Sequence, residues 1–596
     1  LDLLTRDSDE KTFNLVFIDY KSLGVRQLGS IYEGLLEFKL RIASEKMAVC
    51  KGKKTEEVVP YREAKTKNLK VLTIGRGKDA KERIYKPGDV YLENDRHERK
   101  ITGSYYTPNY IVEYIVENTV GPVLEEKFEA LRPKLREAEK AYRDAVKRKE
   151  AFEKQGMRGD DPEKVANTYE HVVRELFDVK ALDPAMGSGH FLVEAVDFIT
   201  DKMLDFLNGF PWNPVISQLN TMRETILHEM EEQGITIDAA RLTDVNLLKR
   251  HVLKRCIYGV DLNPMAVELA KVSLWLDCFT LGAPLSFFDH HLKCGNSLVG
   301  AENIEEHIPP RSGRREAFIR AVGELLQITA LADATSTEVH TSQKLYREAT
   351  SLLEPTRKRL NVQVSRHFQE FDSEAELHHA WAFAHQENEA GQESSGLDLR
   401  TGSRKKFFKA QEIAGERRFL HWELEFPEIF YGMREDAGRV FERRPNPGFD
   451  AVIGNPPYVR QEALTELKPY LKAAFPKVYN GIADIYVYFY GRGLGILRKG
   501  GRFGMITSNK FMRANYGKTL CNYLGNNHAV CEILDFGELP IFEDPMAYPC
   551  ILICQAHTDE EVKPRFTKFH SVPIESLGDV VAKSGKHLPR AAISGE

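Results

Sequence analysis

The chain has 596 residues, which is too many for one compact core, so we expect two or more domains. Hydrophobic residues make up 42% and charged residues 29%, as in an ordinary globular protein, and no apolar run or signal peptide predicts a membrane partner or export. The formal net charge of −5 neither argues for nucleic-acid binding nor excludes it, because a groove can be basic within a neutral chain.

The eight cysteines are scattered without the spacing of a disulfide framework, which favours a reducing cytoplasm. Cys550 and Cys554 lie in an apolar, strand-like run without a second Cys or His pair, so we interpret them as core thiols rather than zinc ligands. His290 and His291 near Cys294 lack a second ligand pair in the same way. We therefore predict no metal site.

Residues 1–100 are predicted to form a helical connector with a small region of strands. Within residues 1–45, apolar side chains recur at near-helical spacing and predict amphipathic helices. These side chains are Leu28, Ile31, Leu35, Leu36 and Phe38. Residues 68–103 predict short strands, with turns at Gly75-Arg76-Gly77 and at Pro87-Gly88.

The next segment is rich in interspersed Glu, Lys and Arg. Residues 109–155 predict a long charged helical region, either a helical hairpin or a short coiled-coil arm, which we place at about 122–170. We interpret its charges as a solvated helix surface, so they predict no partner by themselves.

From Val179 onward, strand-like runs alternate with helical patterns. The strand-like runs are Val179–Leu182, Cys256–Val260, Val452–Gly454, Phe503–Thr507, Val530–Leu534 and Cys550–Ile553. This alternation predicts an α/β fold with a largely parallel, doubly wound sheet. A polar, helical insertion at residues 301–448 interrupts the alternation, and residues 561–596 have the pattern of a further domain that begins there.

A glycine turn stands at the first strand-to-helix junction, Asp183-Pro184-Ala185-Met186-Gly187-Ser188-Gly189-His190-Phe191. Gly187 and Gly189 let the backbone approach a ligand closely, and this is where an open α/β sheet binds a nucleotide-like cofactor. A dinucleotide-binding turn needs a third glycine where this chain has Leu192, so a pyrophosphate ligand is disfavoured. A cofactor without phosphates fits better, and S-adenosylmethionine is the obvious one.

Two more polar residues follow predicted strands. Asp261 ends the second strand, where a carboxylate can accept hydrogen bonds from both ribose hydroxyls of a cofactor. Alternatively, Asp261 only caps the helix that begins near Pro264. A third loop, Cys294–Leu298, could supply Asn296 to the adenine ring of the cofactor.

The turn Asn455-Pro456-Pro457-Tyr458 follows an apolar run, Phe449–Gly454, that predicts a buried strand. The Asn455 amide oxygen and a main-chain carbonyl can accept two hydrogen bonds from one exocyclic amino group. The prolines stiffen the turn, and the Tyr458 ring can stack on the flat base that carries the amine. An amine held in this way keeps its lone pair free for attack. For these four residues alone, a plain Pro-Pro turn that caps a strand remains an alternative.

Together, these motifs resemble the gamma class of N6-adenine DNA methyltransferases, above all the methylase portion of type IIG restriction–modification enzymes or of related phage-defence methyltransferases. The resemblance covers roughly residues 100–556. Thr102–Pro108 resembles the cofactor-binding segment, which the gamma order places before the glycine turn. Other segments similar to the family are His421-Trp422 with Phe426-Pro427, and Gly500–Ser508 with Asn509-Lys510-Phe511.

The resemblance implies a site-specific methyltransferase that moves a methyl group from S-adenosyl-L-methionine to N6 of an adenine flipped out of double-stranded DNA. It implies that Asn455, Pro456, Pro457 and Tyr458 are catalytic, with Tyr458 and Phe511 stacking on the target base. The cofactor-binding residues that it implies are Tyr106, Thr107, Pro108, Asp183, Ala185, Gly187, Gly189, Asp261 and Asn296.

The resemblance also implies a division of the chain. Residues 101–300 become the cofactor half and residues 449–560 the catalytic half of the methyltransferase domain, and residues 561–596 begin a truncated target-recognition domain. A nuclease domain or a specificity domain outside these residues is a further expected partner. Glu37-Phe38-Lys39 has the Glu-x-Lys form of a nuclease site, with Asp19 upstream, but it falls in a helical pattern, so we predict no nuclease site in this chain.

Other functions stay open at this point. Methylases of protein glutamine and of ribosomal-RNA guanine also use Asn-Pro-Pro-Tyr, although they are usually compact and lack large insertions. The same geometry can present the N4 amine of cytosine. A non-catalytic DNA-binding subunit that keeps the fold is an alternative from a different class.

Overall fold

The computed structural model describes most of the chain, namely residues 6–8, 15–17, 38–51, 56–67, 69–74, 81–94, 107–155, 157, 161–236, 238–386, 399–434, 440–542, 548–557, 562–572, 576–589 and 593. The chain separates into two compact units, Leu1–Tyr106 and Thr107–Glu596. No helix within these ranges is long and apolar enough to cross a membrane.

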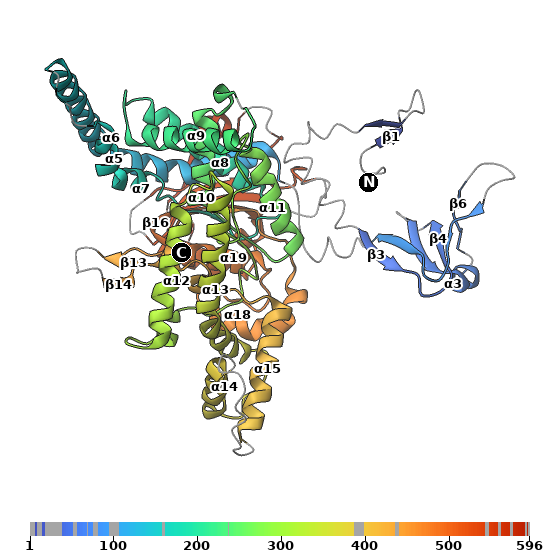
Figure 1. Ribbon diagram of the computed structural model, residues 1–596. Helices are drawn as coiled ribbons and strands as arrows, with labels where there is room; N and C mark the ends of the chain where they lie inside the picture. Colours follow the sequence, from blue (N-terminus) through green and yellow to red (C-terminus); the bar gives the residue numbers. More distant parts are fainter. Residues whose placement is uncertain are drawn as a thin grey trace. The chain divides into compact units, whose positions relative to one another are not determined.

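The first unit consists mainly of short antiparallel strands (Figure 1). The strand pairs are β1 (Arg6–Ser8) with β2 (Leu15–Phe17), β3 (Phe38–Ile42) with β9 (Val90–Asn94), β4 (Met47–Lys51) with β5 (Glu56–Pro60) and β8 (Ile84–Tyr85), and β6 (Thr73–Ile74) with β7 (Lys81–Glu82). The short helix α3 (Tyr61–Thr66) follows β5. Ala43, Met47 and Tyr91 form a small buried core. The strands predicted between residues 68 and 103 are confirmed where the structure describes this stretch, whereas the predicted turn Gly75-Arg76-Gly77 lies outside the described residues.

The helices predicted for residues 1–45 are wrong wherever the structure describes this stretch, because β1, β2 and β3 are strands. Phe38–Ile42 alternates apolar and basic residues, a period of two that suits a strand, and Val90–Asn94 supplies its backbone partners. Lys39 of the Glu-x-Lys segment therefore lies on a strand, which removes our argument against a nuclease site there. Glu37 and Asp19 lie outside the described residues.

The second unit is organised around one nine-stranded sheet. Its strands, in spatial order, are β12 (Leu292–Cys294), β11 (Ile257–Asp261), β10 (Ala181–Asp183), β15 (Phe449–Gly454), β16 (Leu497–Ser508), β18 (Pro549–Gln555), β17 (Ala529–Asp535), β19 (Arg565–Lys568) and β20 (Lys586–His587). The first five are mutually parallel, and β18 runs antiparallel to both of its neighbours. The predicted doubly wound α/β fold is confirmed. The order of the chain reverses between β10 and β15, and such a switch point is where open α/β sheets bind ligands.

The structure differs from the prediction at the end of the chain. β19 pairs in parallel with β17, and Thr567 on β19 is only 1% exposed. β20 pairs in turn with β19. The described part of residues 561–596 therefore extends the nine-stranded sheet, because the free edge of β17 offers backbone groups that β19 satisfies.

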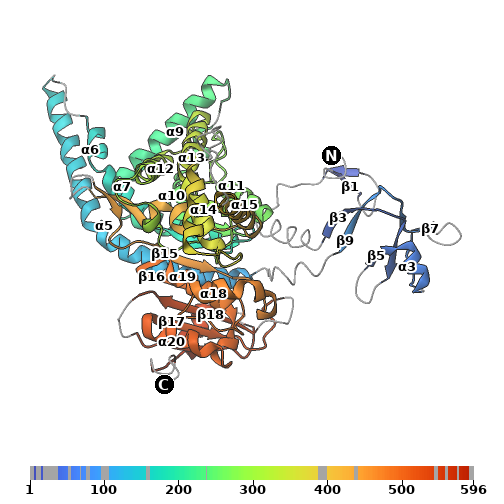
Figure 2. The ribbon, with the colours of Figure 1, turned by 90° about the horizontal axis from the view of Figure 1, so that it is seen from below.

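Helices cover both faces of the sheet (Figure 2). The helices of this unit that lie outside the insertion are α5 (Asn109–Lys154), α6 (Glu163–Thr168), α7 (Glu170–Leu176), α8 (His190–Leu207), α9 (Pro214–Glu232), α10 (Asp244–Cys256), α11 (Pro264–Asp277), α18 (Lys468–Ala474), α19 (Tyr486–Gly495), α20 (Gly517–Asn527) and α21 (Leu577–Ser584). The first half of α5 packs on β15 and β16. Gly504 on β16 permits this close approach, since a Cβ there would lie 2.5 Å from Thr119 Oγ1 on α5.

The charged arm predicted near residues 122–170 consists of the second half of α5 together with α6 and α7, which fold back along it (Figure 1). Lys134 on α5 forms an ion pair with Glu175 on α7 at 2.6 Å. The Tyr169 hydroxyl donates to Glu137 at 3.3 Å. These contacts make the arm a helical hairpin.

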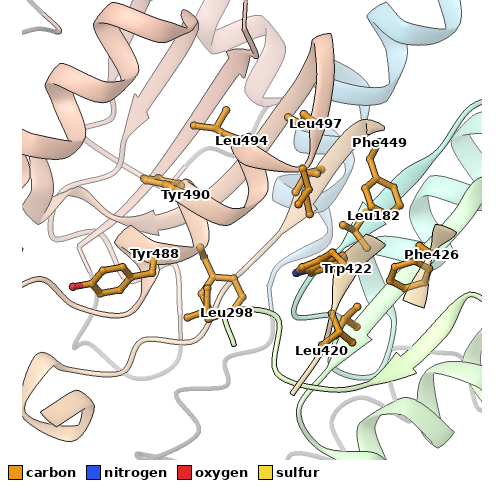
Figure 3. Close-up of a cluster of buried hydrophobic side chains, with 14 of the residues drawn as sticks. Leu182, Leu298, Leu420, Trp422, Phe426, Phe449, Tyr488, Tyr490, Leu494 and Leu497 are labelled. Atoms are coloured by element: carbon orange, nitrogen blue, oxygen red, sulfur yellow. The ribbon is translucent and has the colours of Figure 1, made fainter. Parts of the chain in front are cut away.

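The segment between β12 and β15 forms a layer of helices that shares the core of the sheet. Its elements are α12 (Gly313–Ala330), α13 (Ser336–Ser365), α14 (Glu374–Gln386), α15 (Leu399–Arg417), α16 (Trp422–Glu425), α17 (Pro427–Phe430) and the hairpin β13 (Tyr431–Arg434) with β14 (Val440–Arg443). Phe318 and Leu353 of this layer belong to the same buried cluster as Leu182 and Phe449 of the sheet. Figure 3 shows Trp422 beside Leu182 and Leu420 in this cluster. The insertion therefore has an apolar inner face.

A buried ion pair also ties the insertion to the sheet's helices. Lys254 on α10 lies 2.5 Å from Asp333, in the turn between α12 and α13, and the two side chains are 2% and 0% exposed. Asp333 also accepts hydrogen bonds from the Ser342 hydroxyl at 2.9 Å and from the Phe287 N–H at 3.0 Å. Burial lowers the pKa of Lys254 to about 8, against the opposing effect of Asp333.

Candidate active site

The polar residues predicted from the motifs meet at one edge of the sheet. Asp183 and Asp261 end the parallel strands β10 and β11, and Asn455 follows β15 directly. Asn296 lies in the loop that follows β12. Because parallel strands end at the same edge, these four side chains surround the switch point between β10 and β15.

The glycine turn is held in a shape that leaves room for a ligand. Gly187 and Gly189 have φ values of 54° and 87°, which suit glycine. The Met186 N–H donates to the Val260 carbonyl at 3.0 Å, and the Ser297 hydroxyl donates to the Pro184 carbonyl at 2.6 Å. A Cβ on Gly187 would have no other atom within 4 Å, so the turn faces open space.

Asp261 is tied to the glycine turn. Its carboxylate accepts the N–H of Gly187 at 2.9 Å and the N–H of Asn263 at 2.7 Å. The side chain of Asn263, not that of Asp261, caps α11 by accepting the Met265 N–H at 3.0 Å. The alternative in which Asp261 only caps this helix is therefore not supported. A carboxylate that accepts two hydrogen bonds keeps further acceptor positions for a ligand.

Asp183 lies behind the turn and is 1% exposed. It accepts the Ala185 N–H at 2.9 Å. Burial, with a smaller contribution from the neighbouring Asp261, raises the pKa of Asp183 to about 8, although the hydrogen bond from Ala185 acts in the opposite direction. Burial also raises the pKa of Asp261, although its two backbone hydrogen bonds and Arg418 act in the opposite direction. Two neighbouring carboxylates of raised pKa form a site that favours a cation.

We expect the protein without cofactor to lose stability as the pH rises through the titration of Asp183. The pKa is about 3.9 in the unfolded chain and about 8 in the folded one. The folded state therefore holds the extra proton, and its stabilising contribution disappears as the pH rises towards 8. Melting temperatures of the wild type and of Asp183→Asn, measured from about pH 5 to about pH 8.5, should show the wild type declining relative to the variant. Parallel curves would contradict this assignment.

Asn296 is directed partly into its own loop. Its Oδ1 accepts the Leu298 N–H at 3.0 Å, and its backbone N–H donates to the Arg418 carbonyl at 2.7 Å. A contact between Asn296 and an adenine ring stays a prediction. Arg418, which the sequence analysis did not single out, contacts the Leu262 carbonyl and the Cys294 Sγ. Its charge helps to keep Asp261 ionised. No local pattern distinguishes Arg418 from other arginines in the insertion.

The segment before β15 holds this third loop in place. The Trp422 indole N–H donates to the Ser297 carbonyl at 3.0 Å. His421 Nδ1 accepts the Ala301 N–H at 2.9 Å, and its Nε2 lies 2.9 Å from Asn361 Oδ1 on α13. Burial lowers the pKa of His421 to about 3, so the ring is neutral and serves as a structural bridge.

The Asn-Pro-Pro-Tyr turn lies against the glycine turn. Gly454, the last residue of β15, has a φ of 150°, and a Cβ there would lie 2.6 Å from Asp183 Oδ1. Only glycine permits this contact between the two turns. Asn455 Nδ2 donates to Thr107 Oγ1 at 3.0 Å. The predicted cofactor segment therefore reaches the turn through Thr107, next to Pro108 at the start of α5, while Tyr106 lies outside the described residues.

The two aromatic residues predicted to stack on a base have different surroundings. Tyr458 is partly exposed, and its ring meets Phe542 edge-on at 6.1 Å. Phe511 is 3% exposed and packs edge-on against Tyr490 at 5.8 Å. A stacking role for Tyr458 suits its exposure. Phe511 lies in the core as described, and its stacking role stays a prediction.

Comparison with known proteins finds a family that matches part of this edge. Residues 255–542 match the family model described as Eco57I restriction-modification methylase. Over these residues the chain is therefore similar to Eco57I restriction-modification methylases. The matched residues include Asp261, Asn296 and the turn from Asn455 to Tyr458.

The curated proteins to which the chain is similar include restriction enzymes and methyltransferases. A putative type II restriction enzyme and methyltransferase of Methanocaldococcus jannaschii is 23% identical over 451 residues, which are 69% of this chain and 32% of that protein. The type II methyltransferase M.BstVI of Geobacillus stearothermophilus is 39% identical over 108 residues, 18% of this chain and 19% of that protein. The chain thus spans about a third or less of the length of these relatives.

Among solved structures, the type IIL restriction-modification enzyme MmeI in complex with DNA is 12% identical, with a TM-score of 0.36 over 83% of this chain and 41% of that chain. The EcoKI M protein of a type I restriction enzyme is 11% identical, with a TM-score of 0.27 over 79% and 70%. These scores are too low to support a conclusion.

Within the described ranges, no group of three or more His, Cys, Asp and Glu side chains could hold a metal ion.

Proposed function

We propose that this methylase domain transfers a methyl group from S-adenosyl-L-methionine to N6 of an adenine flipped out of double-stranded DNA. The observation that carries the proposal is the contact between the glycine turn and the Asn-Pro-Pro-Tyr turn, where Gly454 packs on Asp183. A methyl donor held by one turn and an amine held by the other would then be neighbours, and catalysis by positioning requires this proximity.

The residues of the edge fit S-adenosylmethionine better than a dinucleotide. The open space above Gly187 can admit a ligand, while Leu192 is fully buried where a dinucleotide turn needs glycine. Asp183 and Asp261 suit the positive charge of a sulfonium, and Asp261 retains acceptor positions for ribose hydroxyls. When bound, this cofactor supplies an electrophilic methyl group.

The chain's own residues act mainly by orientation. Asn455 Oδ1 and the Pro456 carbonyl accept the two N–H groups of the target amine, which leaves its lone pair free. Flipping the base costs a few kcal/mol, and stacking on an aromatic ring returns about 1–3 kcal/mol per base. The stacking free energy of Tyr458, with or without Phe511, is therefore similar in size to the cost of flipping the adenine, so these rings can hold the extruded base.

We expect Asp261→Asn to weaken the binding of S-adenosylmethionine about 10- to 100-fold. The change removes a charged acceptor, and the new side-chain NH2 group would face one of the two backbone N–H groups that the carboxylate now accepts. Isothermal titration calorimetry of the variant measures the change. Asp289→Asn is a matched control, because Asp289 is an acidic residue that pairs with Lys271 on α11 instead of with the glycine turn. An unchanged affinity in Asp261→Asn would contradict a role in cofactor binding.

The function itself is tested with the intact gene product that contains this chain. The protein is incubated with S-adenosylmethionine labelled in its methyl group and with unmethylated DNA, RNA or a protein extract in parallel. We expect label in DNA alone, recovered as N6-methyladenine by mass spectrometry. Label recovered as N4-methylcytosine, or in RNA or protein glutamine, would overturn the assignment to adenine in DNA.

A non-catalytic subunit is the second candidate class. It would bind S-adenosylmethionine or DNA without methyl transfer, and the same assay separates it from an enzyme. The family of the domain favours action in restriction–modification or phage defence, together with a nuclease domain or a specificity domain outside this chain.

A further inference from the structure

Thr107 is held rigidly at the base of the candidate site. It is 4% exposed and immediately precedes Pro108, the N-cap of α5, whose carbonyl accepts the Ile111 N–H at 3.0 Å. Ile111 and Ile115 on the next turns of α5 are fully buried, and this half of α5 packs on β15 and β16. The helix and the strand that carries Asn455 therefore move as one packed body.

Thr107 contacts the residue on which the proposed chemistry depends most. Its Oγ1 accepts a hydrogen bond from Asn455 Nδ2 at 3.0 Å, across 348 residues of sequence. The terminal amide of an asparagine rotates easily, and a half turn exchanges the positions of its oxygen and nitrogen. The two orientations are not equivalent for the target, because an amine whose lone pair must stay free offers only N–H donors. Only the orientation that presents Oδ1 can accept them.

We propose that Thr107 is a positioning residue that holds the Asn455 amide in place, by accepting a hydrogen bond from Nδ2 so that Oδ1 faces the amine. This inference rests on the proposed function and refines it. The resemblance assigns Thr107 to cofactor binding, whereas the inference gives it a role in positioning Asn455. A threonine suits the task because its β-branched side chain restricts χ1 and keeps the hydroxyl in place. The contact couples the start of α5 to the acceptor of the target amine.

The test compares Thr107→Val, Thr107→Ser and Thr119→Val in the intact protein. Valine has the shape of threonine without the hydroxyl, and serine keeps the hydroxyl. Thr119 is a matched control, because it is fully buried on α5, the helix that Thr107 precedes, and its hydroxyl donates to the Ile115 carbonyl rather than to the site. We expect Thr107→Val to lower the single-turnover rate of methyl transfer about 10- to 100-fold. The affinity for S-adenosylmethionine should stay within about twofold of wild type.

Thr107→Ser should recover most of the rate, and Thr119→Val should leave it near wild type even if its melting temperature falls. A normal rate in Thr107→Val, or a loss of cofactor affinity at an unchanged rate, would overturn the inference. Absence of methyl transfer in the wild type would instead refute the proposed function. Neutron crystal structures, which locate the amide hydrogens and so distinguish nitrogen from oxygen, decide in that case. The inference requires the Asn455 amide to turn or to adopt two conformers in Thr107→Val, and an unmoved amide contradicts it.

Discussion

Replacing Asn455 with alanine is expected to lower the rate of methyl transfer by at least about 10²- to 10³-fold, on the scale of removing one preorganised hydrogen-bonding group from an active site. The amine would lose one of its two acceptors and would no longer be aimed at the methyl donor. Asn455 contacts Thr107, whereas the carboxylates that we assign to the cofactor lie on β10 and β11. We therefore expect the affinity for S-adenosylmethionine to stay within about twofold of wild type.

Single-turnover kinetics and calorimetry on Asn455→Ala measure the two quantities separately. Tyr458→Phe is the control, because it alters the same turn but keeps the aromatic ring, and it should retain most of the rate. A wild-type rate in Asn455→Ala would refute the role of this turn. A loss confined to cofactor affinity would place Asn455 on the donor side instead.

The second large effect concerns stability. Lys254→Met should destabilise the fold by about 3–5 kcal/mol, because it leaves the Asp333 carboxylate buried without its cation. Asp333 is 0% exposed and lies in the turn between α12 and α13, while Lys254 lies on α10, which leads directly into β11 and Asp261. The loss should therefore loosen both the insertion and the edge that carries the site.

Thermal melting and limited proteolysis of the cofactor-free protein measure this effect, with the α12–α13 turn as the expected site of early cleavage. The double variant Lys254→Met/Asp333→Asn should recover much of the loss, since it removes both charges together. Asparagine also tolerates the φ of 52° at this position. A Lys254→Met protein that melts and resists proteolysis like wild type would show that the pair contributes little.

The sequence predicts those parts of the site whose backbone conformation depends on residues close together in the chain. The positive φ values of Gly187 and Gly189 and the stiff prolines of the Asn455–Tyr458 turn act within a few residues. Strand–helix alternation likewise predicted the doubly wound sheet, because each strand buries both faces and each helix covers one. Asp261 was correctly placed at a strand end, although its bond to the Gly187 N–H could not be read from the chain.

The errors and omissions share a different cause. The predicted helices rested on apolar spacing that ends at Phe38, whereas Phe38–Ile42 is a strand that pairs with Val90–Asn94. Arg418 reaches Leu262 from the far end of the insertion, and residues near 565 joined the sheet rather than beginning a separate domain. Each outcome depended on which distant segment offered a partner, and single-sequence patterns carry no such information.

The sequence by itself determined the turns and their chemistry, since Gly, Pro, Asn and Asp at fixed offsets impose backbone shapes and hydrogen-bonding groups on their immediate neighbours. Only the tertiary structure decided that Thr107 meets Asn455, that Gly454 packs on Asp183, and that Phe511 is buried. These contacts join residues far apart in the chain, and they form because burial of the α5 face and of the sheet core brings the segments together.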